Sequence, residues 1–288
     1  MPRNVLAVIG VGGMGQVIAR RQGAGSHVLI ADFDEGLLES VADQLRDEGF
    51  LVTPSTVDVS SPESVAALAA RAATLGEVRA VVHTAGLSAA QAPVRAILAV
   101  DLLGVALVLD AFGDVIAPGG AGVVIASMAG HFHPVLPDEV ASVLASSPAE
   151  ELLSLPIADP ANFADSGSAY SFAKYANLLR VQAASSAWGA RDARINSISP
   201  GVIATPMGRT ELNGEHGSSM RAMIDASNAK RVGTPADIAA AVDFLLGPAA
   251  TFISGADLLV DGGVVAATRT GRLSGRVPPT RRARQGDT

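Results

Sequence analysis

Residues 5–15 read Val-Leu-Ala-Val-Ile-Gly-Val-Gly-Gly-Met-Gly, a short apolar run followed by closely spaced glycines. The apolar run predicts a buried strand, and the glycines predict a sharp turn into a helix that continues to Arg21. Glycine lets the backbone of such a turn lie close to a pyrophosphate, whose charge meets the positive end of the helix. The pattern therefore predicts a dinucleotide-binding loop made of Gly10, Gly12, Gly13, Met14 and Gly15. The alternative is a glycine turn that only eases the packing of helix on strand.

An aspartate follows each of the next two predicted strands. Asp32 ends the strand His27–Ala31, where a carboxylate accepts hydrogen bonds from the adenosine ribose and repels a 2′-phosphate. Phe33 comes next, so no adjacent arginine balances such a phosphate, and the sequence favours NAD(H) over NADP(H). Asp58, followed by Val59, ends the third strand and is expected to hydrogen-bond the adenine amino group. A turn or capping aspartate is the alternative.

Strands and helices alternate along most of the chain. Further strands are predicted at Ala80–His83, Val123–Ala126, Arg194–Ser197 and Leu258–Val260, and further helices at about Glu35–Glu48, Pro93–Phe112, Ser168–Trp188 and Thr234–Leu246. This alternation predicts one α/β domain over residues 1–268, a Rossmann-like, doubly wound, parallel seven-stranded sheet with helices on both faces. Ligands of such sheets bind beyond the carboxyl ends of the strands. The residues at or near those ends are Gly10, Asp32, His83, Ser127 and Pro200.

Two segments interrupt this alternation. Residues 131–167 contain several apolar positions, and we expect them to form a partly helical flap over the carboxyl end of the sheet. The same apolar positions fit an oligomer interface equally well. Residues 269–288 combine arginine with glycine, serine and proline and have almost no apolar periodicity, which predicts a disordered tail. Anion or nucleic-acid binding by this tail is an alternative.

The composition limits the function classes. Apolar residues make up 49% and charged residues 17% of the 288-residue chain, which indicates a packed domain. The net charge of −7 argues against general affinity for nucleic acid. We expect no membrane partner, because Asp101 interrupts the apolar run at 97–109. There is no cysteine and no recognisable signal peptide, so we expect a cytoplasmic protein without thiolate metal sites. We predict no metal site of another kind, because no further ligand cluster accompanies His131 and His133.

Tyr170 and Lys174 stand four residues apart on a predicted helix, so they project from one face. An ammonium group beside a phenol stabilises the phenolate and lowers a pKa that is ordinarily about 10. The lysine thereby makes the tyrosine a usable general acid and base. This spacing is common by chance, and it gains meaning from the glycine loop and from Ser127 at the end of a strand.

Together these features resemble the short-chain dehydrogenase/reductase family over roughly residues 3–265. Besides the tyrosine and lysine, the matching motifs are Ser127-Met128-Ala129-Gly130, Ile195-Asn196-Ser197-Ile198-Ser199-Pro200-Gly201 with Thr205-Pro206-Met207, Arg231-Val232-Gly233-Thr234-Pro235 and Leu259-Val260-Asp261-Gly262-Gly263. The long insertion between serine and tyrosine is similar to that of the bacterial 3α-hydroxysteroid dehydrogenase/carbonyl reductase group. By that resemblance the insertion shapes a pocket for bulky apolar ketones and can obstruct a tetramer contact. The expected assembly is a homodimer or homotetramer.

The resemblance implies a role for each matching residue. Tyr170 exchanges a proton with the substrate oxygen, and Ser127 holds that oxygen by a hydrogen bond. Lys174 lowers the pKa of Tyr170 and binds the nicotinamide ribose, while the hydride itself comes from the cofactor. Further cofactor contacts are implied for Ala85, Gly86, Pro200, Gly201, Ile203 and Thr205.

Three positions depart from the family pattern. The glycine loop has Ile9 in place of the usual threonine and is one residue shorter. His83 replaces an asparagine after the fourth strand, as a structural stand-in or, alternatively, as a catalytic base. Asp101 replaces the asparagine that holds a water in the proton relay to lysine. Asp101 can accept from that water and pair with Lys174, but its charge weakens the effect of the lysine on Tyr170. The other interpretation of Asp101 is a polar residue that bends its helix.

The resemblance implies an NAD(H)-dependent oxidoreductase that interconverts a secondary alcohol and a ketone by hydride transfer. Its small-molecule substrate is expected to be bulky and apolar, alicyclic or steroid-like. The first alternative is a ketoreductase of secondary metabolism that acts on a polyketide-like substrate. The second is an NAD-binding regulator with weak catalysis, which Asp101 and the altered loop suggest. The intact set of Ser127, Tyr170 and Lys174 opposes this second alternative.

Overall fold

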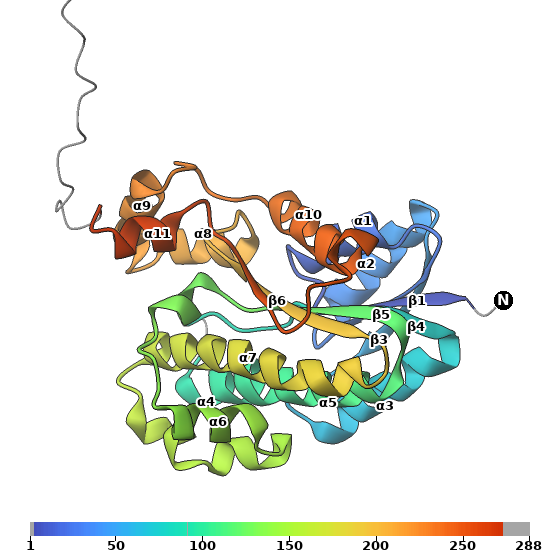
Figure 1. The fold of residues 1–288 in the computed structure, drawn as a ribbon. Helices are drawn as coiled ribbons and strands as arrows, with labels where there is room; N and C mark the ends of the chain where they lie inside the picture. The colour runs from blue at the N-terminus through green and yellow to red at the C-terminus, as the bar shows by residue number, and fades with distance from the viewer. Residues whose placement is uncertain (1–2, 91, 273–288) are drawn as a thin grey trace, which may run out of the picture.

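Across the described residues, 3–90 and 92–272, the computed structural model contains seven strands gathered in one sheet (Figure 1). The strands are β1 (Asn4–Ile9), β2 (His27–Asp32), β3 (Leu51–Thr56), β4 (Glu77–His83), β5 (Ile116–Ile125), β6 (Arg194–Pro200) and β7 (Asp257–Val260). Neighbouring strands run parallel in the order β3-β2-β1-β4-β5-β6-β7. The predicted fold class, a doubly wound Rossmann-like sheet, is confirmed.

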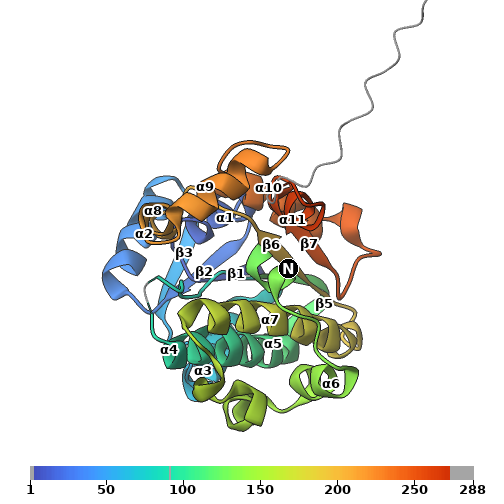
Figure 2. The ribbon, with the colours of Figure 1, turned by 90° about the vertical axis from the view of Figure 1, so that its left-hand side faces the viewer.

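Helices cover both faces of the sheet (Figures 1 and 2). One face carries α1 (Gly15–Gln22), α2 (Glu35–Asp47) and α10 (Pro235–Leu246). The other carries α3 (Pro62–Leu75), α4 (Val94–Ile97), α5 (Gly104–Val115) and α7 (Ser166–Gly189). Three short helices lie toward the carboxyl ends of the strands: α8 (Pro206–Asn213), α9 (Gly217–Ala226) and α11 (Val264–Arg269).

The inner strands are buried on both sides, because their side chains alternate between two hydrophobic cores. In β1, Val5, Ala7 and Ile9 point into the core that contains α3, α5 and α7. Leu6 and Val8 point into the core that contains α1, α2 and α10. All of these side chains are at most 1% exposed. This two-sided burial explains why the strand reads as an unbroken apolar run.

The predicted helix at 93–112 forms as one helical stretch, Val94–Val115, with a π-helical segment η1 (Leu98–Leu103) between α4 and α5. By length and composition alone this stretch is apolar enough to cross a membrane. It packs between α3, α7 and the sheet, and its Phe112 is fully buried. Its apolarity is therefore that of a core helix. The sequence did not indicate the π-helical segment.

Strand β5 begins at Ile116, well before the predicted start at Val123. The first half of this strand was not predicted because it contains Pro118, Gly119 and Gly120, and proline and glycine are depleted in strands. Gly119 has a positive φ of 77°, and the pairing with β4 shifts in register over this part.

The insertion at 131–167 is partly helical, as expected, but it does not cover the carboxyl end of the sheet. Its helix α6 (Asp138–Ser146) packs on α7, and its segment η3 (Ala149–Ser154) packs on α5 and η1. Leu144 and Leu152 are fully buried in these contacts. Figures 1 and 2 show the insertion as an additional layer on the side of α7 that faces away from the sheet. The apolar side chains that suggested a flap pack against helices instead.

Arg180 fastens this layer to α7. It is 6% exposed, and its guanidinium donates hydrogen bonds to the carbonyl oxygens of Ser147 at 2.6 Å and Leu144 at 3.5 Å. Carbonyl groups at the C-terminal end of a helix lack partners within that helix, and a cation satisfies them well. The C-terminal end of α6 is thereby fixed to α7.

The predicted domain boundary at residue 268 falls within α11, whose last residue is Arg269. Arg272 donates a hydrogen bond to Asn228 at 3.0 Å, so the first residues of the predicted tail belong to the fold. Residues 273–288 lie outside the described residues, and their predicted disorder stays a prediction.

We expect Leu144→Ala to lower the free energy of unfolding by about 2–5 kcal/mol, because it removes a fully buried side chain from the contact between α6 and α7. Val143→Ala, on the same helix but 51% exposed, should change this free energy by less than about 0.5 kcal/mol. Chemical denaturation followed by circular dichroism measures both effects. Equal effects of the two substitutions would contradict the packing of α6 on α7.

Candidate active site

The glycine loop turns from β1 into α1 through contacts that only glycine permits. Gly10 has a φ of 93°, and its N–H donates a hydrogen bond to the Ala31 oxygen at 2.7 Å. A Cβ on Gly15 would lie 1.9 Å from the Gly10 oxygen, and a Cβ on Gly13 would lie 2.8 Å from the Thr205 side chain. A Cβ on Gly12, in contrast, would meet nothing within 4 Å. The predicted loop is therefore a tight turn that is open on the side of Gly12.

The N-terminus of α1 fits an anionic group. Its N-cap residue is Met14, and no side chain caps the helix. The N–H groups of the first turn are thus available to a phosphate, and the dipole of the helix adds to the attraction. Gly12, Gly13 and Met14 would hold the pyrophosphate of a dinucleotide at this position.

The two carboxylates predicted to bind the nucleoside also support the backbone around them. Asp32 accepts hydrogen bonds from the N–H of Val11 at 2.7 Å and the N–H of Asp34 at 3.1 Å. Asp58 accepts hydrogen bonds from the N–H and the hydroxyl of Ser60, at 2.9 and 2.6 Å. The Asp58 contacts match the alternative that this aspartate shapes a turn. A carboxylate accepts about four hydrogen bonds, so both side chains keep capacity for a nucleoside.

Lys174 and Asp101 form a buried ion pair at the centre of the site. The lysine Nζ lies 2.9 Å from Asp101 Oδ1, and the two side chains are 5% and 0% exposed. The other Asp101 oxygen accepts a hydrogen bond from the N–H of Leu87 at 3.1 Å. Gly86 makes room for the pair, because a Cβ there would lie 2.7 Å from Asp101 Oδ1 and 3.3 Å from Nζ. The pairing that the sequence suggested is present. The neighbouring residue Ala85 packs against the glycine loop, because a Cβ on Gly10 would lie 2.4 Å from the Ala85 nitrogen.

The π-helical segment η1 carries Asp101 toward α7, against which it packs. Such segments change the direction of side chains within a helix and are frequent at functional sites. Directly after η1, a Cβ on Gly104 would lie 3.0 Å from the Val59 side chain. Val59 is 5% exposed, so its side chain packs on this helix rather than facing solvent.

Tyr170 precedes Lys174 by one turn, and the lysine Nζ lies 5.4 Å from the centre of the tyrosine ring. Burial raises the pKa of Tyr170, and the charges of Asp101 and Glu211 raise it further. The charge of Lys174 and a hydrogen bond with Ser127 lower it. The net change is upward, so the expected depression by the lysine is more than offset. The pKa of Lys174 is also raised, because the attraction of Asp101 and Tyr170 exceeds the effect of burial.

The segment after β6 forms another side of the site. A Cβ on Gly201 would lie 2.7 Å from the Asp261 Cα, so this glycine lets the ends of β6 and β7 approach each other. Ile203 is 7% exposed and forms an isolated parallel β-bridge with Gly233. The Thr205 hydroxyl accepts a hydrogen bond from the Gly208 N–H at 3.0 Å and caps α8. The predicted residues of this segment, Pro200, Gly201, Ile203 and Thr205, thus link the sheet to α8.

His83, which the sequence suggested as a structural stand-in for asparagine or as a catalytic base, is buried. It is 1% exposed, and neither ring nitrogen has a hydrogen-bond partner among the described residues. Thr84 supports the glycine loop instead, because its hydroxyl donates to the Gly10 oxygen at 2.6 Å. Burial and the charge of Lys174 lower the pKa of His83 to about 3. The imidazole is therefore neutral at physiological pH.

Glu211 belongs to the site although no sequence motif pointed to it. It lies on α8, and its charge acts on Tyr170. Burial raises the pKa of Glu211, and a hydrogen bond from Ser88 opposes this change. The only sequence signal was its position a few residues after the motif at Thr205.

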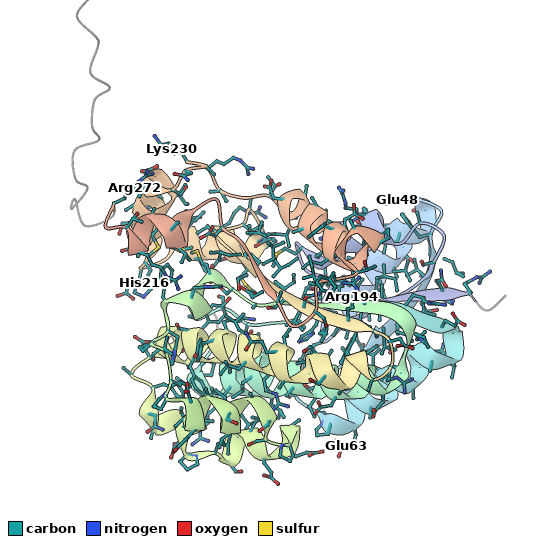
Figure 3. The ribbon with its side chains drawn as sticks, viewed as in Figure 1. Glu48, Glu63, Arg194, His216, Lys230 and Arg272 are labelled. Atoms are coloured by element: carbon teal, nitrogen blue, oxygen red, sulfur yellow. The ribbon has the colours of Figure 1, made fainter. Side chains whose placement is uncertain are left out.

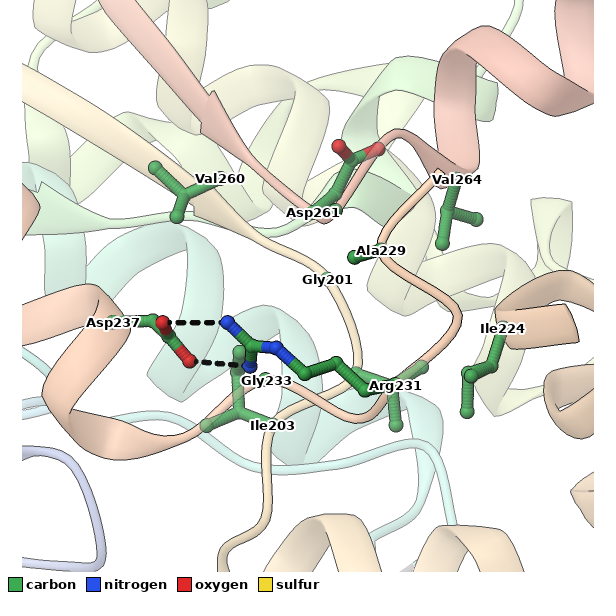
Figure 4. Close-up of a pocket in the computed structure, with 12 residues that line it drawn as sticks. Gly201, Ile203, Ile224, Ala229, Arg231, Gly233, Asp237, Val260, Asp261 and Val264 are labelled. Atoms are coloured by element: carbon green, nitrogen blue, oxygen red, sulfur yellow. Dashed lines mark hydrogen bonds and ion pairs between the residues drawn. The ribbon is translucent and has the colours of Figure 1, made fainter. Parts of the chain in front are cut away.

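A cavity of about 200 Å³ lies beside the segment after β6, and its lining includes Gly201, Val260 and Val264 (Figure 4). Arg231 crosses it and pairs with Asp237 through both terminal nitrogens, at 2.8 and 2.9 Å. The cavity is distinct from the catalytic group, because its lining contains none of Ser127, Tyr170 and Lys174.

Comparison with known proteins identifies the family of the chain. The chain matches the family described as short chain dehydrogenase over residues 4–136 and the family described as Enoyl-(Acyl carrier protein) reductase over residues 157–265. It is 40% identical over 267 residues to short-chain dehydrogenase/reductase bsc3 of Alternaria brassicicola, with 92% of this chain and 97% of that protein covered. It is 30% identical over 269 residues to galactitol 2-dehydrogenase (L-tagatose-forming) of Cereibacter sphaeroides, with 89% and 93% covered. It is 30% identical over 176 residues to 3-alpha-hydroxysteroid dehydrogenase/carbonyl reductase of Comamonas testosteroni, with 60% and 67% covered.

The chain belongs to the short-chain dehydrogenase/reductase family. The predicted resemblance to this family is confirmed, including the similarity to the 3α-hydroxysteroid dehydrogenase/carbonyl reductase group. The protein is accordingly an oxidoreductase that acts on alcohol or ketone groups of small molecules with a nicotinamide cofactor, NAD or NADP.

We expect Asp101→Asn to shift the pH dependence of alcohol oxidation toward lower pH. The charge of Asp101 raises the pKa of Tyr170, so its removal lets the phenolate form at lower pH. Activity should persist, because asparagine can accept a hydrogen bond from Lys174. Loss of the carboxylate leaves the buried Lys174 without its counter-ion, so the free energy of unfolding should fall by about 3–5 kcal/mol. Initial rates measured against pH test the shift. An unchanged profile would contradict it, and complete inactivation would mean that the aspartate has chemistry of its own.

Proposed function

We propose that this protein is an NAD(H)-dependent oxidoreductase that interconverts a secondary alcohol and a ketone by hydride transfer. The observation that carries the proposal is the contact of Tyr170 with both Ser127 and the buried Lys174, at the same edge of the sheet as the glycine loop. A proton donor and a hydrogen-bond donor beside a dinucleotide-binding loop are the groups that this reaction requires.

The protein residues position the substrate oxygen and move its proton. In reduction, the Tyr170 hydroxyl donates its proton to the carbonyl oxygen, and in oxidation the phenolate accepts it from the alcohol. Ser127 donates a second hydrogen bond to the same oxygen, which matters most as negative charge develops there. Bound nicotinamide supplies or accepts the hydride. Because the pKa of Tyr170 is raised, the phenol stays protonated at neutral pH, so reduction is favoured there and oxidation at alkaline pH.

NAD(H) is the proposed cofactor because of Asp32 and its surroundings. The carboxylate stands at the carboxyl end of β2 and is fixed by the N–H of Val11. Phe33 follows it and is 74% exposed, so the adjacent position offers an apolar side chain and no cation. A 2′-phosphate placed here would meet a negative charge without a compensating partner.

We propose a bulky secondary alcohol or ketone, alicyclic or steroid-like, as the substrate class. The name of the Comamonas testosteroni relative supports a ring-bearing substrate, and that of the Cereibacter sphaeroides relative supports a hydroxyl-bearing one. The intact set of Ser127, Tyr170 and Lys174 supports an active enzyme over a regulator. We further propose that the protein acts as a homo-oligomer in the cytoplasm.

We expect Tyr170→Phe to abolish the reduction of ketones while the affinity for NADH changes little. The substitution keeps the ring and removes only the hydroxyl that donates the proton, a step that contributes roughly 10²–10⁴-fold to the rate. Steady-state kinetics measure turnover, and the fluorescence of bound NADH measures affinity. Turnover equal to that of the wild type would refute the role of Tyr170.

We expect the wild type to show a higher kcat/KM with NADH than with NADPH, and Asp32→Asn to reduce this preference. Asparagine keeps an oxygen that can accept from Val11 at this position but removes the charge that repels a 2′-phosphate. Measuring kcat/KM for both cofactors with both proteins tests the role. A wild-type preference for NADPH would contradict it.

A further inference from the structure

Glu211 is a charged group beside Tyr170 that takes no part in the proton transfer described above. It lies on α8 and is partly buried. Glu211 is hydrogen-bonded to Ser88, the residue after Leu87. The Leu87 N–H binds Asp101, so the Glu211 carboxylate lies close to the buried pair of Asp101 and Lys174. Figure 3 shows His216 on the side of α8 and α9 that faces the layer of α7. The carboxylate of Glu211 therefore stands across the active site from the catalytic helix.

This carboxylate has acceptor capacity that the protein leaves unused. Among the described residues, no lysine, arginine or histidine forms an ion pair with Glu211. Its identified hydrogen-bond partner is Ser88, which is fully buried. Ser88 directly follows Leu87, whose N–H donates to Asp101. One hydroxyl cannot saturate the two oxygens of a carboxylate. The other carboxylate of the site, Asp101, is already occupied by Lys174 and Leu87.

We propose that Glu211 determines substrate specificity by accepting a hydrogen bond from a second hydroxyl group of the substrate, on a carbon other than the one that reacts. This inference rests on the proposed function and narrows its substrate class to alicyclic or steroid-like alcohols and ketones that carry a second hydroxyl group. A hydroxyl suits the site better than an ammonium group, because Lys174 already places a positive charge beside the reacting oxygen. The oxidised nicotinamide ring would add a second positive charge during alcohol oxidation.

The test compares cyclohexanol with 1,3- and 1,4-cyclohexanediol, which share the ring and differ by a second hydroxyl. We expect the wild type to oxidise at least one diol with a higher kcat/KM than cyclohexanol. Glu211→Leu should lower the ratio of the two kcat/KM values roughly 10- to 100-fold, the range for a hydrogen bond to a charged group, mainly through KM. The ratio is the informative quantity, since losing the Glu211 charge lowers the pKa of Tyr170 for both substrates alike.

Two further variants separate this role from a structural one. Glu211→Gln keeps an acceptor oxygen and should retain part of the preference for the diol. Glu215→Gln, on an exposed residue of the loop after α8, should leave the ratio unchanged. Thermal unfolding and NADH binding check that each variant is folded.

The outcomes distinguish this inference from the function on which it rests. An unchanged ratio in both Glu211 variants, with cyclohexanol still oxidised by the wild type, would overturn the role of Glu211 and leave the proposed function intact. A preference for 4-aminocyclohexanol over the diols that depends on Glu211 would overturn the choice of a hydroxyl. A wild type that binds NADH but oxidises none of these alcohols and reduces none of the matching ketones would overturn both proposals.

Discussion

The buried ion pair between Lys174 and Asp101 is the interaction on which the rest of the site depends. Its atoms lie 2.9 Å apart, and both side chains are almost completely removed from water. Burying two charges costs more than their attraction returns unless additional hydrogen bonds and close geometry compensate. Here the Leu87 N–H supplies a hydrogen bond, and the missing side chain of Gly86 allows the approach. Burial raises the pKa of Asp101, and the charge of Lys174 opposes that change.

This pair joins three elements that are distant in sequence: the loop after β4, the segment η1 and helix α7. The lysine charge is consequently shared between a carboxylate and the phenol of Tyr170. Because Asp101 takes the closer contact, the phenol receives only part of the stabilisation that an isolated lysine would give. The site therefore holds a tyrosine that retains its proton well, together with a lysine that is firmly cationic.

The sequence predicted the fold and the residues that gather at the sheet edge, because short motifs with fixed spacing encode them. The glycine loop, the alternation of strands and helices and the pairing of Asp101 with Lys174 are of this kind. Features set by packing between distant segments were not predictable. The insertion, for example, packs on the outer side of α7 rather than over the carboxyl ends of the strands (Figure 1). Glu211 and the π-helical segment at Asp101 carry no local signature, since only the folded chain brings them to the site.

The packing of α6 on α7 has a consequence for quaternary structure. Arg180 and Leu144 use the outer surface of the catalytic helix for an internal contact, so a neighbouring subunit cannot dock there. A copy that approached this face would meet α6 in place of that part of α7. The edge of the sheet at β7 is not covered in this way. Strand β7 has a strand neighbour on one side only, and Phe252, shortly before it in the sequence, is fully exposed. A segment that does not line the catalytic group thus restricts which symmetric assemblies the chain can build.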